Sequence, residues 1–209
     1  MPVIFQEKID ASLTTEVWNF TESEAFLLSQ LTLNDHDKRN ILSLQLPKRR
    51  LEKLACRMAL QDILHLECPT SDLTALTYSQ TGAPQLPPHH LSFSHSTNYA
   101  AVAFSPTQPV GIDIEKIGHR LENVYSHFMN EEEISQVDCH NANLLHYYWG
   151  AKEALYKLHS TGHLDYQTDI HILPYESQQG YLLVDGQKTN YHLIHREIDG
   201  NCLVIAIAE

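Results

Sequence analysis

The sequence predicts an α+β fold, because segments with helical periodicity are followed by segments with strand patterns, and this order occurs twice. In the first part, helical patterns end before residue 70 and strand patterns follow to about residue 105. In the second part, helical patterns between residues 131 and 158 precede strand patterns that reach residue 208. Segregated helices and strands are typical of α+β proteins. The repetition also indicates two related halves that meet near Pro109.

The composition and charge of the chain argue against two classes of partner. Its 209 residues are 43% hydrophobic and 19% charged, which is typical of a folded globular protein with one large domain or two modest ones. Lysine and arginine number 14 against 26 aspartates and glutamates, which gives a net charge of −12. A field of this sign repels phosphate polymers and anionic membrane surfaces, so we expect neither nucleic acid nor a membrane as a partner.

The cysteines and the first residues indicate a cytoplasmic protein. The chain has no C-x-x-C motif, so the pattern predicts neither a zinc knuckle nor a disulfide scaffold. Scattered thiols suit a reducing compartment. The first ten residues include three charged ones and lack a long apolar stretch, so they predict neither a signal peptide nor a membrane span. The four cysteines are Cys56, Cys68, Cys139 and Cys202.

Two helices are predicted in the first half. Residues 21–33 have helical spacing, and Thr21 with Glu24 forms the pattern of a capping box. Residues 48–66 carry an apolar stripe that predicts a longer helix packed on a core. The basic residues of this second segment are spaced by three and four positions, so they predict a basic edge: Arg50, Lys53 and Arg57.

Strands and loops are predicted between the second helix and the middle of the chain. Residues 76–88 indicate a strand, a turn at residues 81–84 and a proline-rich surface loop. A buried strand is predicted within residues 91–105, and it ends at the Ser-Pro-Thr-Gln-Pro turn of residues 105–109. A further strand over residues 110–115 follows directly.

The second half is predicted to consist of helices followed by an antiparallel sheet. Helical spacing covers residues 131–137 and 144–158. Four segments with strand patterns follow, at residues 167–173, 180–184, 191–196 and 202–208.

Two carboxylates are predicted to share one face of the strand at residues 110–115. Side chains alternate along a strand, so Asp113 and Glu115 project together while Ile112 and Ile114 point to the other side. Like charges at this spacing repel each other, and Mg²⁺ compensates such pairs because it prefers carboxylates, water and phosphate oxygens. The alternative is a strand with one solvated acidic face, which strand statistics by themselves favour.

A second group of charged residues lies within the predicted helix at residues 144–158. Trp149, Glu153 and Lys157 are spaced by four and lie on one stripe, with Lys152 beside them. The glutamate could serve as a metal ligand or a general base. The two lysines could neutralise the negative charge of a phosphoryl group during its transfer. The alternative is an ordinary surface ion pair, worth about 0.3 to 0.5 kcal/mol.

A third candidate lies where the buried strand of residues 91–105 begins. Hydroxyl groups and an imidazole cluster in Ser92-Phe93-Ser94-His95-Ser96. Such groups suit a phosphate ligand. The alternative is a surface or core histidine, which is the commoner environment for a residue that occurs 14 times in this chain.

The two charged motifs together resemble the signatures of the 4′-phosphopantetheinyl transferase superfamily. In that family the first signature reads roughly G-[IV]-D and the second W-x-x-K-E-[AS]-x-x-K; here they are Val-Gly-Ile-Asp-Ile-Glu at residues 110–115 and Trp-Gly-Ala-Lys-Glu-Ala-Leu-Tyr-Lys at residues 149–157. Upstream, Gly82-Ala83-Pro84 resembles the family's G-x-P turn, and residues 93–96 resemble its F-x-x-S-H-S region. The order and length are similar to the surfactin-synthetase-activating type.

This resemblance implies a fold and an activity. The fold is a pseudo-dimer of two subdomains, each with helices packed on a small antiparallel sheet, here residues 1–109 with the coenzyme A nucleotide contacts and 110–209 with the magnesium-binding and catalytic motifs. The activity is Mg²⁺-dependent transfer of 4′-phosphopantetheine from coenzyme A to a serine of an apo acyl or peptidyl carrier protein, which releases 3′,5′-ADP. Such carriers serve fatty acid, polyketide or nonribosomal peptide biosynthesis. Because both halves belong to one chain, a monomer is expected.

The resemblance also implies roles for individual residues. The metal ligands are Asp113, Glu115 and Glu153. The catalytic residues are Glu153 as general base, Lys157 near the reacting phosphates, and Glu132, whose register among three consecutive glutamates stays open. The coenzyme contacts are Arg50, Arg57, Ser94, His95 and Lys152.

Two departures from the family pattern leave alternatives open. Ala83 stands where many members of the family have lysine, and His127 stands where arginine is common, so two fixed positive charges are missing. The main alternative is therefore a non-catalytic member of the same fold that binds coenzyme A or a carrier protein. Another is an unrelated Mg²⁺-dependent phosphohydrolase that uses the same carboxylates with water as the nucleophile.

Overall fold

The chain folds into two compact units, Met1–Gln108 and Pro109–Glu209. The computed structural model describes residues 3–10, 13–159 and 163–209. The predicted boundary after residue 109 lies one residue away from the division between the units. Both units combine helices with antiparallel sheets, so the predicted α+β class is confirmed. No helix within the described ranges is both long and apolar enough to cross a bilayer.

The N-terminal unit contains a four-stranded antiparallel sheet in the order β1-β2-β6-β5. The segment predicted as one strand over residues 91–105 is a hairpin, because the chain turns at Thr97, whose φ is 51°. Strands β1 and β2 were not predicted; the buried positions of β2 include the polar residues Thr14, Thr15 and Glu16, which obscure the alternation. The strands are β1 (Val3–Asp10), β2 (Leu13–Asn19), β5 (His90–Ser96) and β6 (Tyr99–Ser105).

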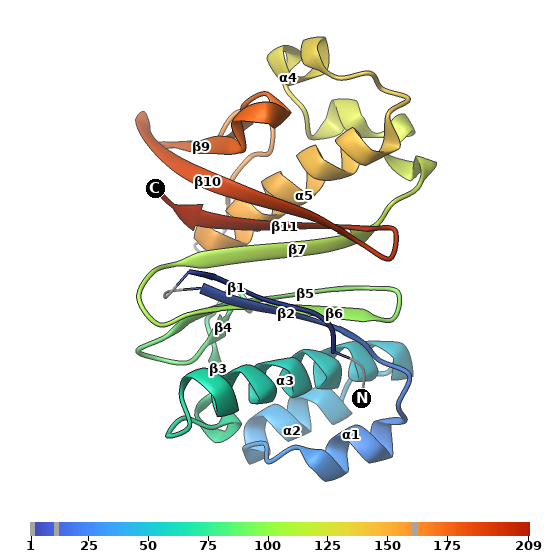
Figure 1. The fold of residues 1–209 in the computed structure, drawn as a ribbon, viewed down its shortest axis with the longest axis vertical. Coiled ribbons are helices and arrows are strands. Elements are labelled where there is room, and N and C mark those ends of the chain that lie inside the picture. Colours follow the sequence, from blue (N-terminus) through green and yellow to red (C-terminus); the bar gives the residue numbers. More distant parts are fainter. Residues whose placement is uncertain (1–2, 11–12, 160–162) are drawn as a thin grey trace. The chain divides into compact units, whose positions relative to one another are not determined.

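Three helices lie on one side of this sheet, with α3 directly against it (Figure 1). The first helix begins at Glu24 because Ser23 accepts a hydrogen bond from the Phe26 backbone N–H, so the predicted capping box at Thr21 is wrong. The second helix was not predicted. The long third helix was predicted, and proline occupies its first turn. The helices are α1 (Glu24–Gln30), α2 (Asp35–Leu42) and α3 (Pro47–Glu67).

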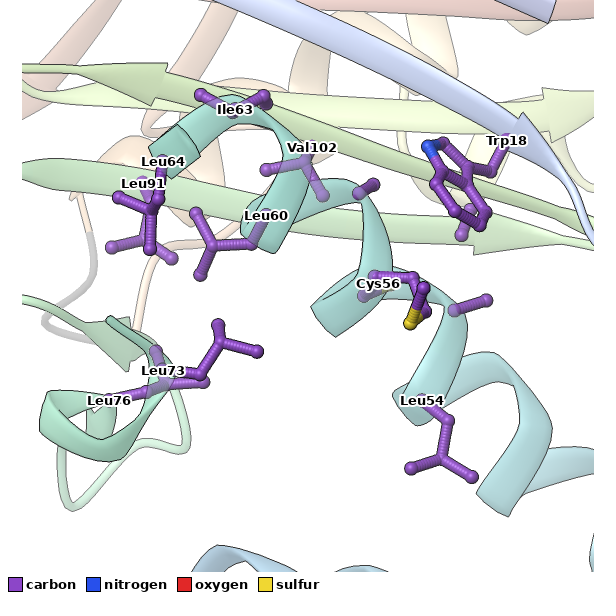
Figure 2. Close-up of a cluster of buried hydrophobic side chains, with 14 of the residues drawn as sticks. Trp18, Leu54, Cys56, Leu60, Ile63, Leu64, Leu73, Leu76, Leu91 and Val102 are labelled. Carbon is purple, nitrogen blue, oxygen red and sulfur yellow. The ribbon is translucent and has the colours of Figure 1, made fainter. Parts of the chain in front are cut away.

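The core of the N-terminal unit lies between α3 and the sheet. Figure 2 shows Trp18 and Val102 of the sheet close to the α3 side chains Cys56, Leu60 and Ile63. These side chains are at most 2% exposed. Their burial removes apolar surface from water and holds the helix on the strands.

A short hairpin and a turn complete the N-terminal unit. Strands β3 (Thr77–Tyr78) and β4 (Pro84–Gln85) pair across the predicted turn, where Gly82 has a φ of 85°. The 3-10 helix η1 (Leu73–Ala75) precedes them and adds Leu73 to the core.

The C-terminal unit contains a five-stranded antiparallel sheet in the order β7-β11-β10-β9-β8. Helix α5 packs on one face of this sheet (Figure 1). Both predicted helices and all five predicted strands of this half are present. The strands are β7 (Val110–Lys116), β8 (Ile170–Ile172), β9 (Gln179–Val184), β10 (Gln187–Ile198) and β11 (Asn201–Ala208). The helices are α4 (Glu131–Gln136) and α5 (Ala142–His159), with the 3-10 turns η2 (His119–Asn123), η3 (Tyr125–His127) and η4 (Tyr175–Ser177).

The two units share one pattern of connections. In the N-terminal unit, β2 leads to α3 and then to the hairpin β5–β6, whose second strand pairs with β2. In the C-terminal unit, β7 leads to α5 and later to the hairpin β10–β11, whose second strand pairs with β7. The repeated order noted in the sequence therefore corresponds to a repeated topology.

Candidate active site in the C-terminal unit

Two glycines bring α5 close to β7. A Cβ atom on Gly111 of β7 would lie 1.9 Å from the carbonyl oxygen of Ala154 in α5, far inside van der Waals contact. A Cβ atom on Gly150 of α5 would lie 3.0 Å from Val204 Cγ2 and 3.7 Å from Asp113 Oδ2. The absence of side chains at these positions therefore allows the helix backbone to approach the strand. This approach places the carboxylates of the strand next to the charged residues of the helix.

Asp113 is buried between β7 and α5, with 4% of its surface exposed. Lys157 Nζ lies 2.7 Å from Asp113 Oδ1 and 3.0 Å from the carbonyl oxygen of Ile112, and it donates to both. A solvated acidic strand face is therefore wrong for Asp113. The helix lysine compensates the charge of the strand carboxylate, in a half-buried ion pair whose attraction water screens only in part.

Glu115 follows on the same face of β7 and is half-buried. Its Oε1 atom lies 2.9 Å from a terminal guanidinium nitrogen of Arg120, which η2 supplies. Burial raises the pKa of Glu115, and the negative charge of Asp113 raises it further, while Arg120 and Lys157 lower it. The sequence analysis did not identify Arg120 as part of this group.

Glu153 projects from α5 and is also half-buried. The hydroxyl of Tyr166 donates to Glu153 Oε1 over 2.7 Å. Burial raises the pKa of Glu153, the hydrogen bond from Tyr166 opposes that rise, and the charge of Asp113 adds to it. A carboxylate with a raised pKa is a stronger base than an exposed one, which suits proton abstraction.

The chemistry of these carboxylates suits a hard divalent cation. The negative charge of Asp113 raises the pKa of both Glu115 and Glu153, so the three carboxylates are electrostatically coupled. Within the part of the chain that is described, no group of three or more acidic, histidine or cysteine residues is arranged to hold a metal. Instead, Lys157, Arg120 and Tyr166 each donate to one carboxylate. Carboxylate oxygens are nonetheless the kind of donor that Mg²⁺ prefers.

Lys152 is enclosed by the protein, with 0% exposure. Its ammonium group donates to the carbonyl oxygens of Tyr166 and Ile170, each over 2.6 Å, and pairs with Glu133 Oε2 at 2.9 Å. Burial lowers the pKa of Lys152, and the charge of Glu133 opposes this. The structure therefore gives this lysine three protein partners, whereas the resemblance assigned it to the coenzyme.

Of the consecutive glutamates in α4, the structure buries Glu133 and leaves Glu132 exposed. Glu133 accepts hydrogen bonds from the backbone N–H groups of Ile172 and Asn130, over 2.8 and 2.9 Å. Asn130 in turn caps α4, so the two residues form a capping box. Glu133 is therefore the enclosed residue of the three, and the catalytic role of Glu132 stays a prediction. The pattern Asn-x-x-Glu ahead of an isoleucine was the signal that could have identified it.

Arg57 in the N-terminal unit is buried rather than exposed on a basic edge, so that expectation is wrong. Its guanidinium group forms a two-pronged ion pair with Asp37, over 2.6 and 2.5 Å. It also donates to the carbonyl oxygen of Lys53 over 2.7 Å and to the hydroxyl of Tyr78. Only 1% of the residue is exposed. These contacts join α2, α3 and β3.

The remaining predicted coenzyme contacts lie around the start of α3 and on β5. Arg50 donates to Glu24 Oε2 over 2.8 Å and to the carbonyl oxygen of Leu44 over 2.7 Å. His95 Nδ1 lies 3.6 Å from Glu52 Oε2, and Ser94 is buried beside it on β5. Lys48 and Arg49 are exposed and also pair with Glu52, at 3.9 and 2.9 Å.

Comparison with known proteins bears on the C-terminal unit. Residues 109–208 match the model of the 4′-phosphopantetheinyl transferase superfamily. The comparison with curated proteins finds no match. The matched segment contains Asp113, Glu115, Glu153 and Lys157, as well as the glycines that bring β7 and α5 together. The C-terminal unit is thus similar, over nearly its whole length, to the 4′-phosphopantetheinyl transferase superfamily.

Proposed function

We propose that the protein transfers the 4′-phosphopantetheine group of coenzyme A to a serine of an apo carrier protein, with Mg²⁺, and releases 3′,5′-ADP. The observation that carries this proposal is the packing of α5 on β7, which sets Asp113, Glu115, Glu153 and Lys157 together within a segment that matches the superfamily. Three coupled carboxylates beside a lysine suit the handling of a charged diphosphate.

Each of these residues has a proposed role. Asp113, Glu115 and Glu153 would hold Mg²⁺, which when bound screens the negative charge of the diphosphate from the nucleophile. Lys157, which donates to Asp113, would neutralise charge on the leaving phosphate.

The proposed reaction is a displacement at the β-phosphorus of coenzyme A. The serine oxygen forms a bond to this phosphorus, and the bond from the phosphorus to the bridging oxygen breaks. The leaving group is 3′,5′-ADP, which keeps that oxygen. The proton of the serine passes to the carboxylate of Glu153, whose raised pKa favours its acceptance.

Residues of the N-terminal unit have the proposed role of binding the coenzyme. Three cationic residues lie at the start of α3: Lys48, Arg49 and Arg50. Together with Ser94 and His95 of β5, they offer hydrogen-bond donors for the nucleotide phosphates. Arg57 and Lys152 are enclosed by protein partners, so we propose that they support binding only through the elements that they join.

The proposal is tested by mixing the protein with coenzyme A, Mg²⁺ and a panel of apo carrier proteins from fatty acid, polyketide and peptide synthesis. A mass gain of one phosphopantetheine group on a carrier serine, lost when EDTA is added, is the expected result. Coenzyme A binding with no modified carrier would instead favour the non-catalytic alternative, which the residues Ala83 and His127 motivate. Release of free phosphopantetheine without a carrier would favour hydrolysis.

The substitution Asp113→Asn tests the assignment of the site. It keeps the size of the side chain but removes the charge, so the rate of transfer should fall at least about 100-fold, as expected for loss of a metal-binding carboxylate. Asp199→Asn is the matched control, because it makes the same change at an exposed aspartate in the β10–β11 turn of the same unit. Normal transfer by folded Asp113→Asn protein at saturating Mg²⁺ would overturn the assignment.

A further inference from the structure

Tyr166 contacts four residues of α5. It lies in the turn that leads into β8, outside the helix. Its ring is stacked between two aromatic rings of the helix, those of Trp149 and Tyr156, with centroids 5.6 and 5.5 Å away and ring planes within 14° and 10° of parallel. Trp149 and Tyr156 are seven positions apart, so they lie on the same face of α5 two turns from each other.

The polar groups of Tyr166 are held by two consecutive residues of the same helix. The hydroxyl donates to Glu153 Oε1 over 2.7 Å, and the carbonyl oxygen accepts from Lys152 Nζ over 2.6 Å. Lys152 is itself fixed by Glu133 and by the carbonyl oxygen of Ile170. The ring stack therefore restrains the phenol beside Glu153, and the Lys152 network restrains the backbone from which the phenol projects.

We propose that Tyr166 is a positioning residue for Glu153, an inference that rests on the proposed function. A glutamate side chain has three rotatable bonds, and a free one samples many rotamers. The hydroxyl of Tyr166, held in place by the ring stack, engages Oε1 and fixes the carboxylate. Lys152 of the helix motif then has an indirect role: it fixes the backbone of Tyr166, and Tyr166 orients the neighbouring Glu153.

A purely structural role for Tyr166 predicts a different result from a positioning role. If the ring only fills space, removal of its hydroxyl leaves the stack intact and changes neither metal affinity nor turnover. If the hydroxyl orients Glu153, the same change weakens metal binding and slows transfer. Tyr166→Phe separates the two roles because it keeps the ring between Trp149 and Tyr156.

The experiment compares wild-type protein, Tyr166→Phe and Tyr156→Phe. The control removes a hydroxyl from the adjacent ring of the same stack and leaves the hydrogen bond to Glu153 in place. The binding of Mn²⁺ alone, without coenzyme A, is measured by electron paramagnetic resonance, and thermal unfolding shows that each variant is folded. We expect Mn²⁺ affinity to fall about tenfold in Tyr166→Phe, the usual effect of losing a group that orients a metal ligand, and to stay within about twofold in the control.

The same three proteins are then assayed for transfer to a carrier protein. The value of kcat should fall about tenfold in Tyr166→Phe while KM for coenzyme A changes less than about twofold, because the hydroxyl acts on Glu153 and not on the coenzyme. Wild-type Mn²⁺ affinity and kcat in folded Tyr166→Phe would overturn the inference and leave the proposed function standing. If wild-type protein binds Mn²⁺ but modifies no carrier, the proposed function fails, and the difference in Mn²⁺ affinity still decides the role of Tyr166. If wild-type protein neither binds Mn²⁺ nor transfers, both are wrong.

Discussion

Adding one methyl group to β7 should both destabilise the C-terminal unit and disrupt the candidate site. The substitution is Gly111→Ala. The new Cβ atom would lie 1.9 Å from the carbonyl oxygen of Ala154, 2.8 Å from its carbonyl carbon and 3.0 Å from Leu158 Cβ. The closest atom belongs to the helix backbone, so a change of side-chain rotamer cannot relieve the contact.

The size of the effect follows from the displacement that is required. Cβ atoms in proteins essentially never approach a non-bonded heavy atom of another part of the chain closer than 3.0 Å, so α5 must move away from β7 by about 1 Å or more. Overpacking of a core costs about 1 to 3 kcal/mol when side chains can adjust. Here the obstacle is backbone, so we expect a loss of about 3 kcal/mol, a large part of the stability of a typical domain. The same shift separates Glu153 from Asp113, and Mn²⁺ affinity should fall with it.

Urea denaturation followed by tryptophan fluorescence measures this loss, with Mn²⁺ titration on the folded fraction. Gly118→Ala is the control, because a Cβ atom at that extended position would meet nothing within 4 Å. The control should unfold within about 0.5 kcal/mol of wild type, as surface substitutions usually do. A Gly111→Ala protein with wild-type stability and Mn²⁺ affinity would show that the close approach of α5 to β7 is not required.

Two further predictions concern the N-terminal unit. Burial raises the pKa of Glu16 to about 7, against hydrogen bonds from Trp18 and Gln6, so the folded state keeps a proton that the unfolded chain releases above pH 4.5. Stability should therefore fall by about 1 to 2 kcal/mol, after a discount for solvent screening, as the pH rises from about 5 to 7. Urea denaturation at pH 5 and pH 8 should show this difference, and Glu16→Gln should abolish it; an equal slope in that variant would contradict the assignment to Glu16. Second, Asp37→Ala leaves the Arg57 guanidinium buried without its ion-pair partner and should cost about 3 to 5 kcal/mol in denaturation experiments. A loss below about 1 kcal/mol, the range of exposed ion pairs, would refute this reading.

The sequence predicted the elements whose apolar residues follow one clear period. Helix α3 and the strands of the C-terminal unit belong to this class; the predicted bounds are close to the observed ones for α3 and β11, whereas β10 extends beyond its predicted range at both ends. Strand β2 does not, because its buried positions include Thr15, which donates to the carbonyl oxygen of Val102, and Glu16, which accepts from Trp18. Polar residues that are satisfied inside the protein leave no alternating pattern for sequence analysis to detect.

The same distinction holds for the candidate site. The chain itself determined the chemical groups, since Asp113 and Glu115 alternate onto one strand face and Glu153 and Lys157 lie one helical turn apart. Only the tertiary structure decided which charged groups are enclosed: Arg57 by Asp37, 20 positions away, and Lys152 by Glu133 and the carbonyl oxygens of residues 166 and 170.

The physical reason is the range of the interactions involved. Periodicity acts over a few residues, so the sequence by itself determined most of the helices, most of the strands and the acidic motif. Burial of a charge depends on a partner that the fold brings from elsewhere, because an unpaired charge cannot leave water. Tyr166 shows this most clearly: 13 positions separate it from Glu153, and only the packing of the turn before β8 on α5 joins them.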